Sequence, residues 1–84
     1  MSAASPKVVD VQPREGFLLL LTFSNGERRA FDVSPYLDKG VFRELADVNY
    51  FGRVRVESGY VTWQHEQDFS RDTLYLRSIE GDFA

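Results

Sequence analysis

The sequence contains no cysteine and a single histidine, His65, among its 84 residues. Disulfide bonds, thiol nucleophiles and cysteine-ligated zinc sites are therefore excluded, and so are metal sites that need several histidines. Positive charge does not predominate, because ten Lys and Arg stand against thirteen Asp and Glu, for a formal net charge of −3. This balance argues against nonspecific binding to nucleic acid or to an anionic membrane. Apolar runs are short: the four leucines Leu18–Leu21 lie far below the ~20 residues that cross a bilayer.

The first residues of the sequence are not expected to form a signal peptide. Residues 1–6 lack both the basic part and the apolar part of a secretory signal peptide. We expect residues 1–6 to form a flexible N-terminus, residues 7–80 a single α+β domain, and residues 81–84 a C-terminal tail. Without cysteine or a signal peptide, the chain is predicted to be cytoplasmic.

The sequence is rich in apolar side chains: 43% of the residues are hydrophobic and 14% are aromatic, as in chains with a packed core. Over most of the chain the apolar residues recur at every second position, and this spacing predicts β-strands. With two or three short helices packed on one face, antiparallel hairpins of about five strands predict an α+β fold. The expected strands are Lys7–Gln12 (ended by Pro13), Phe17–Phe23, Glu27–Val33, Arg53–Glu57 and Tyr60–Trp63.

The dipeptide Asn25-Gly26 predicts a hairpin between the second and third of these strands. A two-residue loop would pair Leu20 with Phe31, whereas a three-residue loop with Gly26 in the left-handed conformation would pair Leu19 with Phe31. We favour the longer loop because it separates apolar from polar residues better. It leaves a second, smaller apolar strip on the back of the sheet, formed by Leu18 and Leu20.

A second hairpin is predicted around Ser58-Gly59, between the last two strands. A two-residue loop there pairs Val56 with Val61. The apolar face of this hairpin also includes Trp63, which we expect to be buried.

Turn and capping residues predict three short helices. The first begins with Ser34 as N-cap and Pro35 at the first helical position, and it ends after about one turn because Gly40 follows. Ser70 is the predicted N-cap of the last helix. The other two helices, with the residues expected to face inward, are Val41–Asp47 with Phe42, Leu45 and Ala46, and Arg71–Glu80 with Leu74, Tyr75 and Ile79.

The apolar strip on the back of the sheet has two interpretations. Leu18 and Leu20 either lie beneath the last helix or remain exposed as a patch that a partner covers. If they are exposed, Leu18, Leu20 and Tyr36 are the predicted anchors for a partner, and Arg28 and Arg55 are the predicted rim contacts. The partner would be another small protein or a second copy of the chain, docking face to face or by adding a strand to an uncommitted edge.

The polar stretch that follows Trp63 also has two interpretations. His65, Glu66 and Asp68 could bind a small ligand or a metal ion or transfer protons, since imidazole and carboxylates do both. Alternatively they form a solvated loop in which Asp68 accepts hydrogen bonds from nearby backbone N–H groups. We favour the solvated loop because no second histidine is present to complete a site, and we expect no cofactor.

Catalysis and nucleic-acid binding are both disfavoured. No serine lies in a sequence that resembles a nucleophile elbow, so the chain is predicted not to be an enzyme. Arg28 and Arg55 could share a face with Tyr60 and so bind single-stranded nucleic acid by charge and stacking. The acidic balance of the chain argues against this for the domain alone.

Six segments stand out by their order and spacing: Phe23–Glu27, Ala30–Leu37, Gly40–Leu45, Phe51–Val56, Gly59–Trp63 and Asp68–Tyr75. Together they resemble one small bacterial family, the domain of unknown function numbered twenty-four forty-two. The resemblance covers roughly residues 7–79 and implies an α+β fold and a prokaryotic source, with no established catalytic residues. Members of the family look like short stand-alone proteins, often encoded beside another small protein, which is similar to the arrangement of antitoxin-like or regulatory partners.

The leading functional prediction is therefore a non-catalytic protein-interaction module, antitoxin-like or regulatory towards a neighbouring small protein. A small ligand- or metal-binding protein that uses His65, Glu66 and Asp68 is the alternative, and a nucleic-acid-associated regulator is the second alternative.

Overall fold

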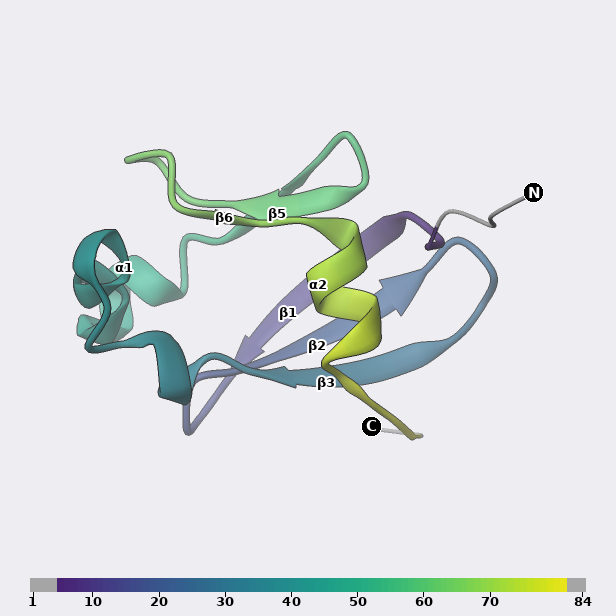
Figure 1. Ribbon diagram of the computed structural model, residues 1–84, viewed down its shortest axis with the longest axis horizontal. Helices are drawn as coiled ribbons and strands as arrows, with labels where there is room; N and C mark the ends of the chain where they lie inside the picture. Colours follow the sequence, from purple (N-terminus) through teal and green to yellow (C-terminus); the bar gives the residue numbers. More distant parts are fainter. Residues whose placement is uncertain (1–4, 82–84) are drawn as a thin grey trace.

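The computed structural model describes residues 5–81, and within that range the chain forms two antiparallel sheets and several short helical segments (Figure 1). The predicted α+β class is confirmed, with seven strands in the described range rather than about five. Most of the predicted terminal segments, residues 1–4 and 82–84, lie outside the described residues. Among the helices of residues 5–81, none has the length and apolar content needed to cross a membrane.

The four strands of the first sheet lie in the order β1-β2-β3-β7, and the three strands of the second sheet lie in the order β4-β5-β6. The first sheet contains β1 Val8–Arg14, β2 Leu18–Phe23, β3 Arg28–Asp32 and β7 Ile79–Glu80. The second contains β4 Arg55–Glu57, β5 Tyr60–Thr62 and β6 Asp68–Phe69. The helical segments are the 3₁₀ helices η1 Ser34–Tyr36 and η2 Gly40–Ala46 and the α-helices α1 Val48–Phe51 and α2 Arg71–Leu76.

The hairpin between β2 and β3 has the longer, bulged loop that the sequence favours. Leu19 pairs with Phe31, and Gly26 has φ +88°, in the left-handed region that glycine adopts without strain. The N–H of Gly26 closes the loop on the carbonyl of Phe23 at 2.9 Å. The predicted register is therefore confirmed, and it decides which leucines of β2 face the core.

The second predicted register is also confirmed. Val56 pairs with Val61, and the loop residues Ser58 and Gly59 both have positive φ, as a type I′ turn requires. The carbonyl of Gly59 accepts a hydrogen bond of 2.9 Å from the N–H of Val8, which ties this hairpin to the first sheet.

One core lies between the two sheets, and α2 packs beside it (Figure 1). Trp63 is completely buried, and its indole N–H donates a hydrogen bond of 2.9 Å to the carbonyl of Phe51. The first sheet contributes Leu19, Leu21, Phe23 and Phe31, and α2 contributes Leu74.

Several predicted details of the elements are wrong. Pro13 does not end the first strand, because β1 is an outer strand of its sheet, where a missing N–H costs no ladder bond. Ser34 is the first residue of η1 rather than its N-cap, and Asp32 accepts the hydrogen bond from its backbone N–H. The helix expected over Val41–Asp47 is the 3₁₀ helix η2, in which Ala46 is exposed rather than buried.

The last helix is shorter than the predicted span Arg71–Glu80. Ser70 caps α2 as expected, by accepting a hydrogen bond from the N–H of Thr73, but the helix ends at Leu76. Ile79, predicted to face inward, is 71% exposed and pairs with Ala30 as part of β7. The chain therefore adds an outer strand to the first sheet where the sequence predicted another helical turn.

Candidate protein-interaction site

Along β2, successive side chains point alternately into the core and onto the opposite face of the first sheet. Leu18, Leu20 and Thr22 are half-buried there, whereas Leu19 and Leu21 are buried in the core. This follows from the run of consecutive leucines, because a strand turns successive side chains to opposite faces. Half of the run must leave the core whichever register the hairpin takes.

The neighbouring strands complete this face, which we call the outer face, since directly paired residues lie on the same side of a sheet. The row through the middle is apolar at three of its four positions: Leu20 pairs with Gln12 and Ala30, and Ala30 pairs with Ile79. The residues of the outer face are Asp10, Gln12, Arg14, Leu18, Leu20, Thr22, Arg28, Ala30, Asp32 and Ile79.

No helix of the described residues 5–81 covers the outer face. The second sheet and α2 lie on the core side of the first sheet, and η2 and α1 lie at one end of the molecule (Figure 1). The last helix therefore does not cover Leu18 and Leu20, which are half-buried on this face. Burying an isoleucine as exposed as Ile79 would contribute about 1.5–3 kcal/mol before any ordering cost.

The outer face suits a macromolecule better than a small ligand. A small hollow between β1, β2 and β3 on this face has a volume of about 20 Å³, room for a single water molecule. Small-molecule sites are usually clefts of ~300–1,000 Å³ that surround the ligand. The face is a shallow surface with an apolar centre and polar corners, which is typical of a protein-binding site.

The sheet edges offer little room for an added strand. β1 forms one edge of the first sheet, but its first residue, Val8, already donates its N–H to Gly59, and Pro13 has no N–H. At the opposite edge β7 occupies the pairing positions of Arg29 and Ala30. The edge strands of the second sheet, β4 and β6, have three and two residues, which are short templates for pairing. The described sheet edges therefore leave few pairing positions for an added strand.

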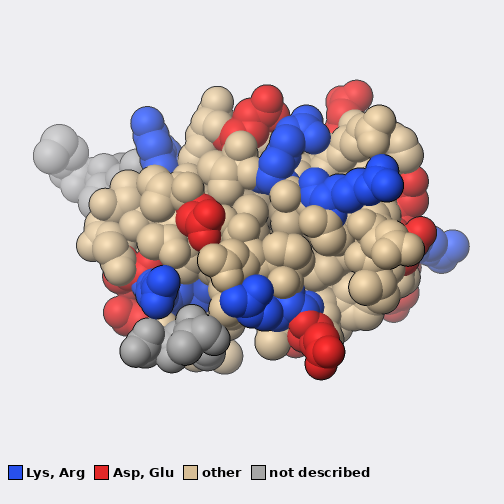
Figure 2. Space-filling model, turned by 180° about the vertical axis from the view of Figure 1, so that it is seen from behind, with Lys and Arg blue, Asp and Glu red and all other residues tan. Residues whose placement is uncertain are grey.

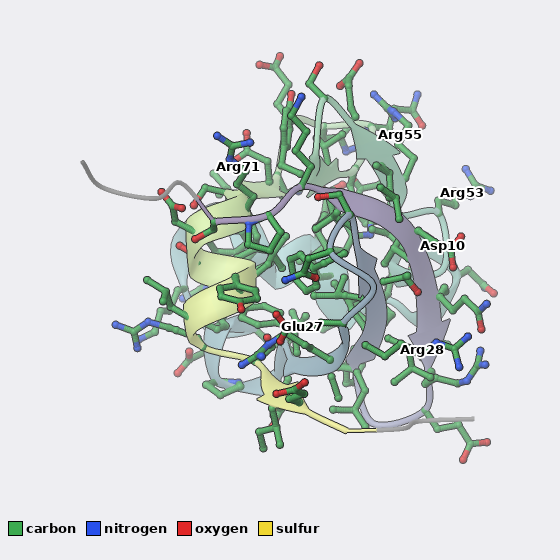
Figure 3. All side chains as sticks on the ribbon, turned by 90° about the vertical axis from the view of Figure 1, so that its right-hand side faces the viewer. Asp10, Glu27, Arg28, Arg53, Arg55 and Arg71 are labelled. Atoms are coloured by element: carbon green, nitrogen blue, oxygen red, sulfur yellow. The ribbon has the colours of Figure 1, made fainter. Side chains whose placement is uncertain are left out.

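The other predicted partner-binding residues do not all join Leu18 and Leu20. Arg28 lies on the outer face, paired with Thr22. Arg55 is paired with Thr62 in the second sheet; Figure 3 shows Arg28 and Arg55 on the same flank of the molecule but apart from each other. Tyr36 lies in an aromatic cluster at the edge of the core, with ring centroids 5.8 Å from Phe31, 6.2 Å from Phe42 and 5.1 Å from Phe69.

The flank that carries Arg28 and Arg55 has mixed charge. Arg53 and Asp10 lie on it as well (Figure 3). Seen from behind, Lys and Arg are spread over the upper and lower parts of the face, and several acidic side chains stand among them (Figure 2). A groove of one sign that would follow a nucleic-acid backbone is not what this surface presents.

The predicted polar loop is well ordered by partners that the sequence did not reveal. His65 Nδ1 lies 2.7 Å from Glu44 Oε2, and the His65 ring stacks on Tyr50 with centroids 5.3 Å apart. Gln67 is only 2% exposed. Its Nε2 donates hydrogen bonds to Glu44 Oε1 at 2.8 Å and to the carbonyl of Val41 at 3.0 Å. The hydrogen bond from Gln67 and the neighbouring His65 ring lower the pKa of Glu44.

These contacts fix the loop but do not form a metal site. Glu66 and Asp68 are exposed, and Glu66 adopts a left-handed conformation with φ +71°. Among residues 5–81, no three His, Asp or Glu side chains come close enough together to hold a metal ion. In the described chain, His65, Glu66 and Asp68 thus do not form a group that could hold a metal ion together. Gln67 and Glu44 were missed because their partners lie about 20 residues away along the chain.

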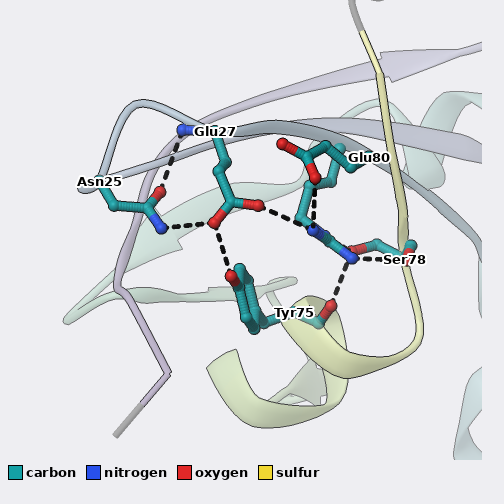
Figure 4. A network of polar contacts seen from close by, with 6 residues as sticks. Asn25, Glu27, Tyr75, Ser78 and Glu80 are labelled. Carbon is teal, nitrogen blue, oxygen red and sulfur yellow. Dashed lines mark hydrogen bonds and ion pairs between the residues drawn. The ribbon is translucent and has the colours of Figure 1, made fainter. Parts of the chain in front are cut away.

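A second polar network attaches α2 and β7 to the β2–β3 hairpin (Figure 4). Glu27 accepts hydrogen bonds from the Tyr75 hydroxyl, from Asn25 and from Arg29, and these bonds lower its pKa. The bond to Glu27 raises the pKa of Tyr75. Arg29 lies over the Tyr75 ring, 4.6 Å from its centroid, and donates to the Ser78 hydroxyl at 2.7 Å. The groups that Glu27 and Arg29 bind in this network belong to the same chain, so we assign the network a structural role.

Comparison with protein families matches residues 8–80 to the family described as "Protein of unknown function (DUF2442)". The match spans all seven strands and all four helical segments of the described chain. Comparisons with curated proteins and with solved structures find no match.

Proposed function

The chain belongs to the DUF2442 family of proteins of unknown function, and we propose that it is a non-catalytic protein-interaction module that binds its partner through the outer face of the first sheet. The observation that carries the proposal is the apolar row at the centre of that face, where Leu20, Ala30 and Ile79 lie side by side. In its finer form, the module is an antitoxin-like or regulatory partner of another small protein, or it pairs with itself, in the cytoplasm.

Two features of the structure support a binding role over a catalytic one. The polar side chains that converge, around Glu27 and around Gln67, are engaged with one another and with the backbone. The small hollow between β1, β2 and β3 on the outer face, about 20 Å³ in volume, is too small for a substrate. Apolar side chains bordered by charge, on a rigid sheet, instead match the anatomy of protein–protein interfaces.

Site-specific photo-crosslinking in the cells that produce the chain tests this proposal. A benzoylphenylalanine in place of Leu18 is expected to give a covalent adduct with another polypeptide, and Leu20→Lys in the same chain is expected to abolish that adduct. The matched control carries the same photoreactive residue at Val48, which is 72% exposed but lies in α1, outside the outer face. Equal adducts at both positions, or none at position 18, would refute binding through the outer face.

A further inference from the structure

The four corners of the outer face carry alternating charges. β1 contributes Asp10 at one end and Arg14 at the other, and β3 contributes Arg28 and Asp32. Asp10 and Arg28 both pair with Thr22, so they share one end of the face, and Arg14 shares the other end with Asp32. Each end and each flanking strand therefore carries one acidic and one basic residue.

We propose that the partner at the outer face is a second copy of this chain, packed face to face about a two-fold axis. The inference rests on the proposed function, because it uses the same face. A two-fold axis along β2 places β1 of each copy over β3 of the other, so that Asp10 meets Arg28 of the second copy and Arg14 meets its Asp32. A two-fold axis across the strands places Asp10 over Arg14 of the second copy and Arg28 over its Asp32. Both arrangements bring all four corner charges against opposite charges.

The centre of the face is complementary to itself in the same arrangements. Leu20 lies in the middle row of the middle strand, so either axis brings it against Leu20 of the second copy. Isologous contacts of this kind, in which one patch meets itself, are the usual basis of two-fold dimers. Two sheets stacked at the usual distance of about 10 Å interdigitate the side chains of their facing surfaces.

The area of the outer face is small compared with that of a stable dimer interface. The three strands β1, β2 and β3, ~4.8 Å apart and about six residues long at ~3.4 Å per residue, give a face of roughly 300 Å² per copy, to which the two residues of β7 add little. A standard stable interface buries about 800 Å² per partner. We therefore expect a weak dimer that loosens as salt screens the corner charges.

Sedimentation equilibrium of the whole chain, from ~10 to ~500 µM, tests the pairing. The wild-type chain is expected to pass from monomer to dimer, and Arg14→Asp, which places like charges together under either axis, is expected to weaken dimerisation at least about tenfold. Leu20→Lys is expected to do the same, since Leu20 lies on both axes. Arg43→Asp, an equal reversal of charge at an exposed residue of η2, is the matched control and is expected to dimerise like wild type.

Mixing two variants that are each monomeric tests the charge pattern itself. For an axis along β2, Arg14→Asp mixed with Asp32→Arg restores the dimer, because each new charge meets its opposite. For an axis across the strands, Arg14→Asp mixed with Asp10→Arg restores it. Circular dichroism must show each variant folded; because Asp32 also accepts hydrogen bonds from Ser34, Leu20→Lys keeps the proposal testable if Asp32→Arg unfolds.

The outcomes separate self-pairing from the proposed function. Restoration in either mixture supports the two-fold dimer and identifies its axis. A chain that stays monomeric throughout, a dimer that survives both Arg14→Asp and Leu20→Lys, or the absence of restoration in both mixtures overturns it. If the chain is monomeric while the photoreactive residue at position 18 captures a different protein, self-pairing fails and the proposed function stands.

Discussion

Trp63 is the residue on which the core depends most. Its ring is fully buried between the sheets and contacts Phe51 and Phe69, with centroids 5.9 and 6.1 Å away. We expect Trp63→Ala to lower the free energy of unfolding by about 3–5 kcal/mol, because the cavity it leaves removes contacts with both sheets. Urea unfolding followed by circular dichroism measures the change. Leu76→Ala, at a site 73% exposed, is the control and should stay within ~0.5 kcal/mol of wild type; a loss below ~1 kcal/mol for Trp63→Ala would contradict the assignment.

Glu27 makes the stability of the fold depend on pH. The Tyr75 hydroxyl, Asn25 and Arg29 hold its pKa below the usual value of 4.5 in the folded chain. A carboxyl group with a lowered pKa contributes stability above its unfolded pKa and loses that contribution as the pH falls through its folded pKa. We therefore expect Glu27→Gln to destabilise the protein at neutral pH and to converge with wild type as the pH falls below about 4.5.

The measurement for Glu27 is the free energy of unfolding in urea at a series of pH values between neutral and acid. Glu57→Gln, on an exposed position of β4, is the matched control and should follow the wild-type curve at a constant offset. A difference in the free energy of unfolding between Glu27→Gln and wild type that stays constant across the series would contradict the prediction. The contribution of Glu27 to stability would then not depend on its charge.

At the scale of the elements, the turn between β4 and β5 fixes the second hairpin. Ser58 and Gly59 have φ of +50° and +85°, and a Cβ at Gly59 would lie 2.8 Å from the Cγ of Lys7. We expect Gly59→Ala to destabilise the protein by at least ~1–2 kcal/mol through strain and crowding. Ser58→Asn should instead raise stability by a few tenths of a kcal/mol, because Asn-Gly is the preferred pair for this turn. Thermal unfolding of both variants checks the signs, and two changes of the same sign would contradict the turn assignment.

The elements set by local signals were the ones that the sequence predicted well. Asn25-Gly26 and Ser58-Gly59 determine two registers through backbone conformation alone, and those registers correctly place Leu18 and Leu20 opposite the core. β7 was missed because its two residues gain their structure only by pairing with β3, about 50 residues earlier in the chain. The sequence thus predicted the outward-facing leucines of β2, the central strand of the outer face. It wrongly predicted that Ile79, the apolar residue that β7 adds to this face, would point into the core.

The polar contacts were the least predictable part of the candidate sites. A glutamine such as Gln67 is usually exposed, and its burial depends on Glu44, Val41 and Tyr50, which only the fold brings near it. Arg29 likewise reaches Ser78 across 49 residues of sequence. Periodicity and turn signals report on neighbours within a few residues, so they contain no information about these partners.

At the scale of the whole molecule, the two sheets share one core rather than having one each. Buried residues of β1, β2 and β3 form a single cluster with Val61, Trp63 and Phe69 of the second sheet region and with Leu74 of α2. Neither sheet could bury its apolar face without the other. We therefore expect urea to unfold residues of both sheets in one cooperative transition.

Two probes measured on the same samples check this cooperativity. The fluorescence of Trp63, the only tryptophan, reports on the contact between the sheets, and far-ultraviolet circular dichroism reports on the backbone of both. The two curves should coincide, with an m-value of ~1 kcal/mol/M because a short chain exposes little surface when it unfolds. A fluorescence change that precedes the loss of strand signal would mean that the first sheet persists after the second detaches. The outer face would then belong to a separately stable unit, which a core shared by both sheets does not allow.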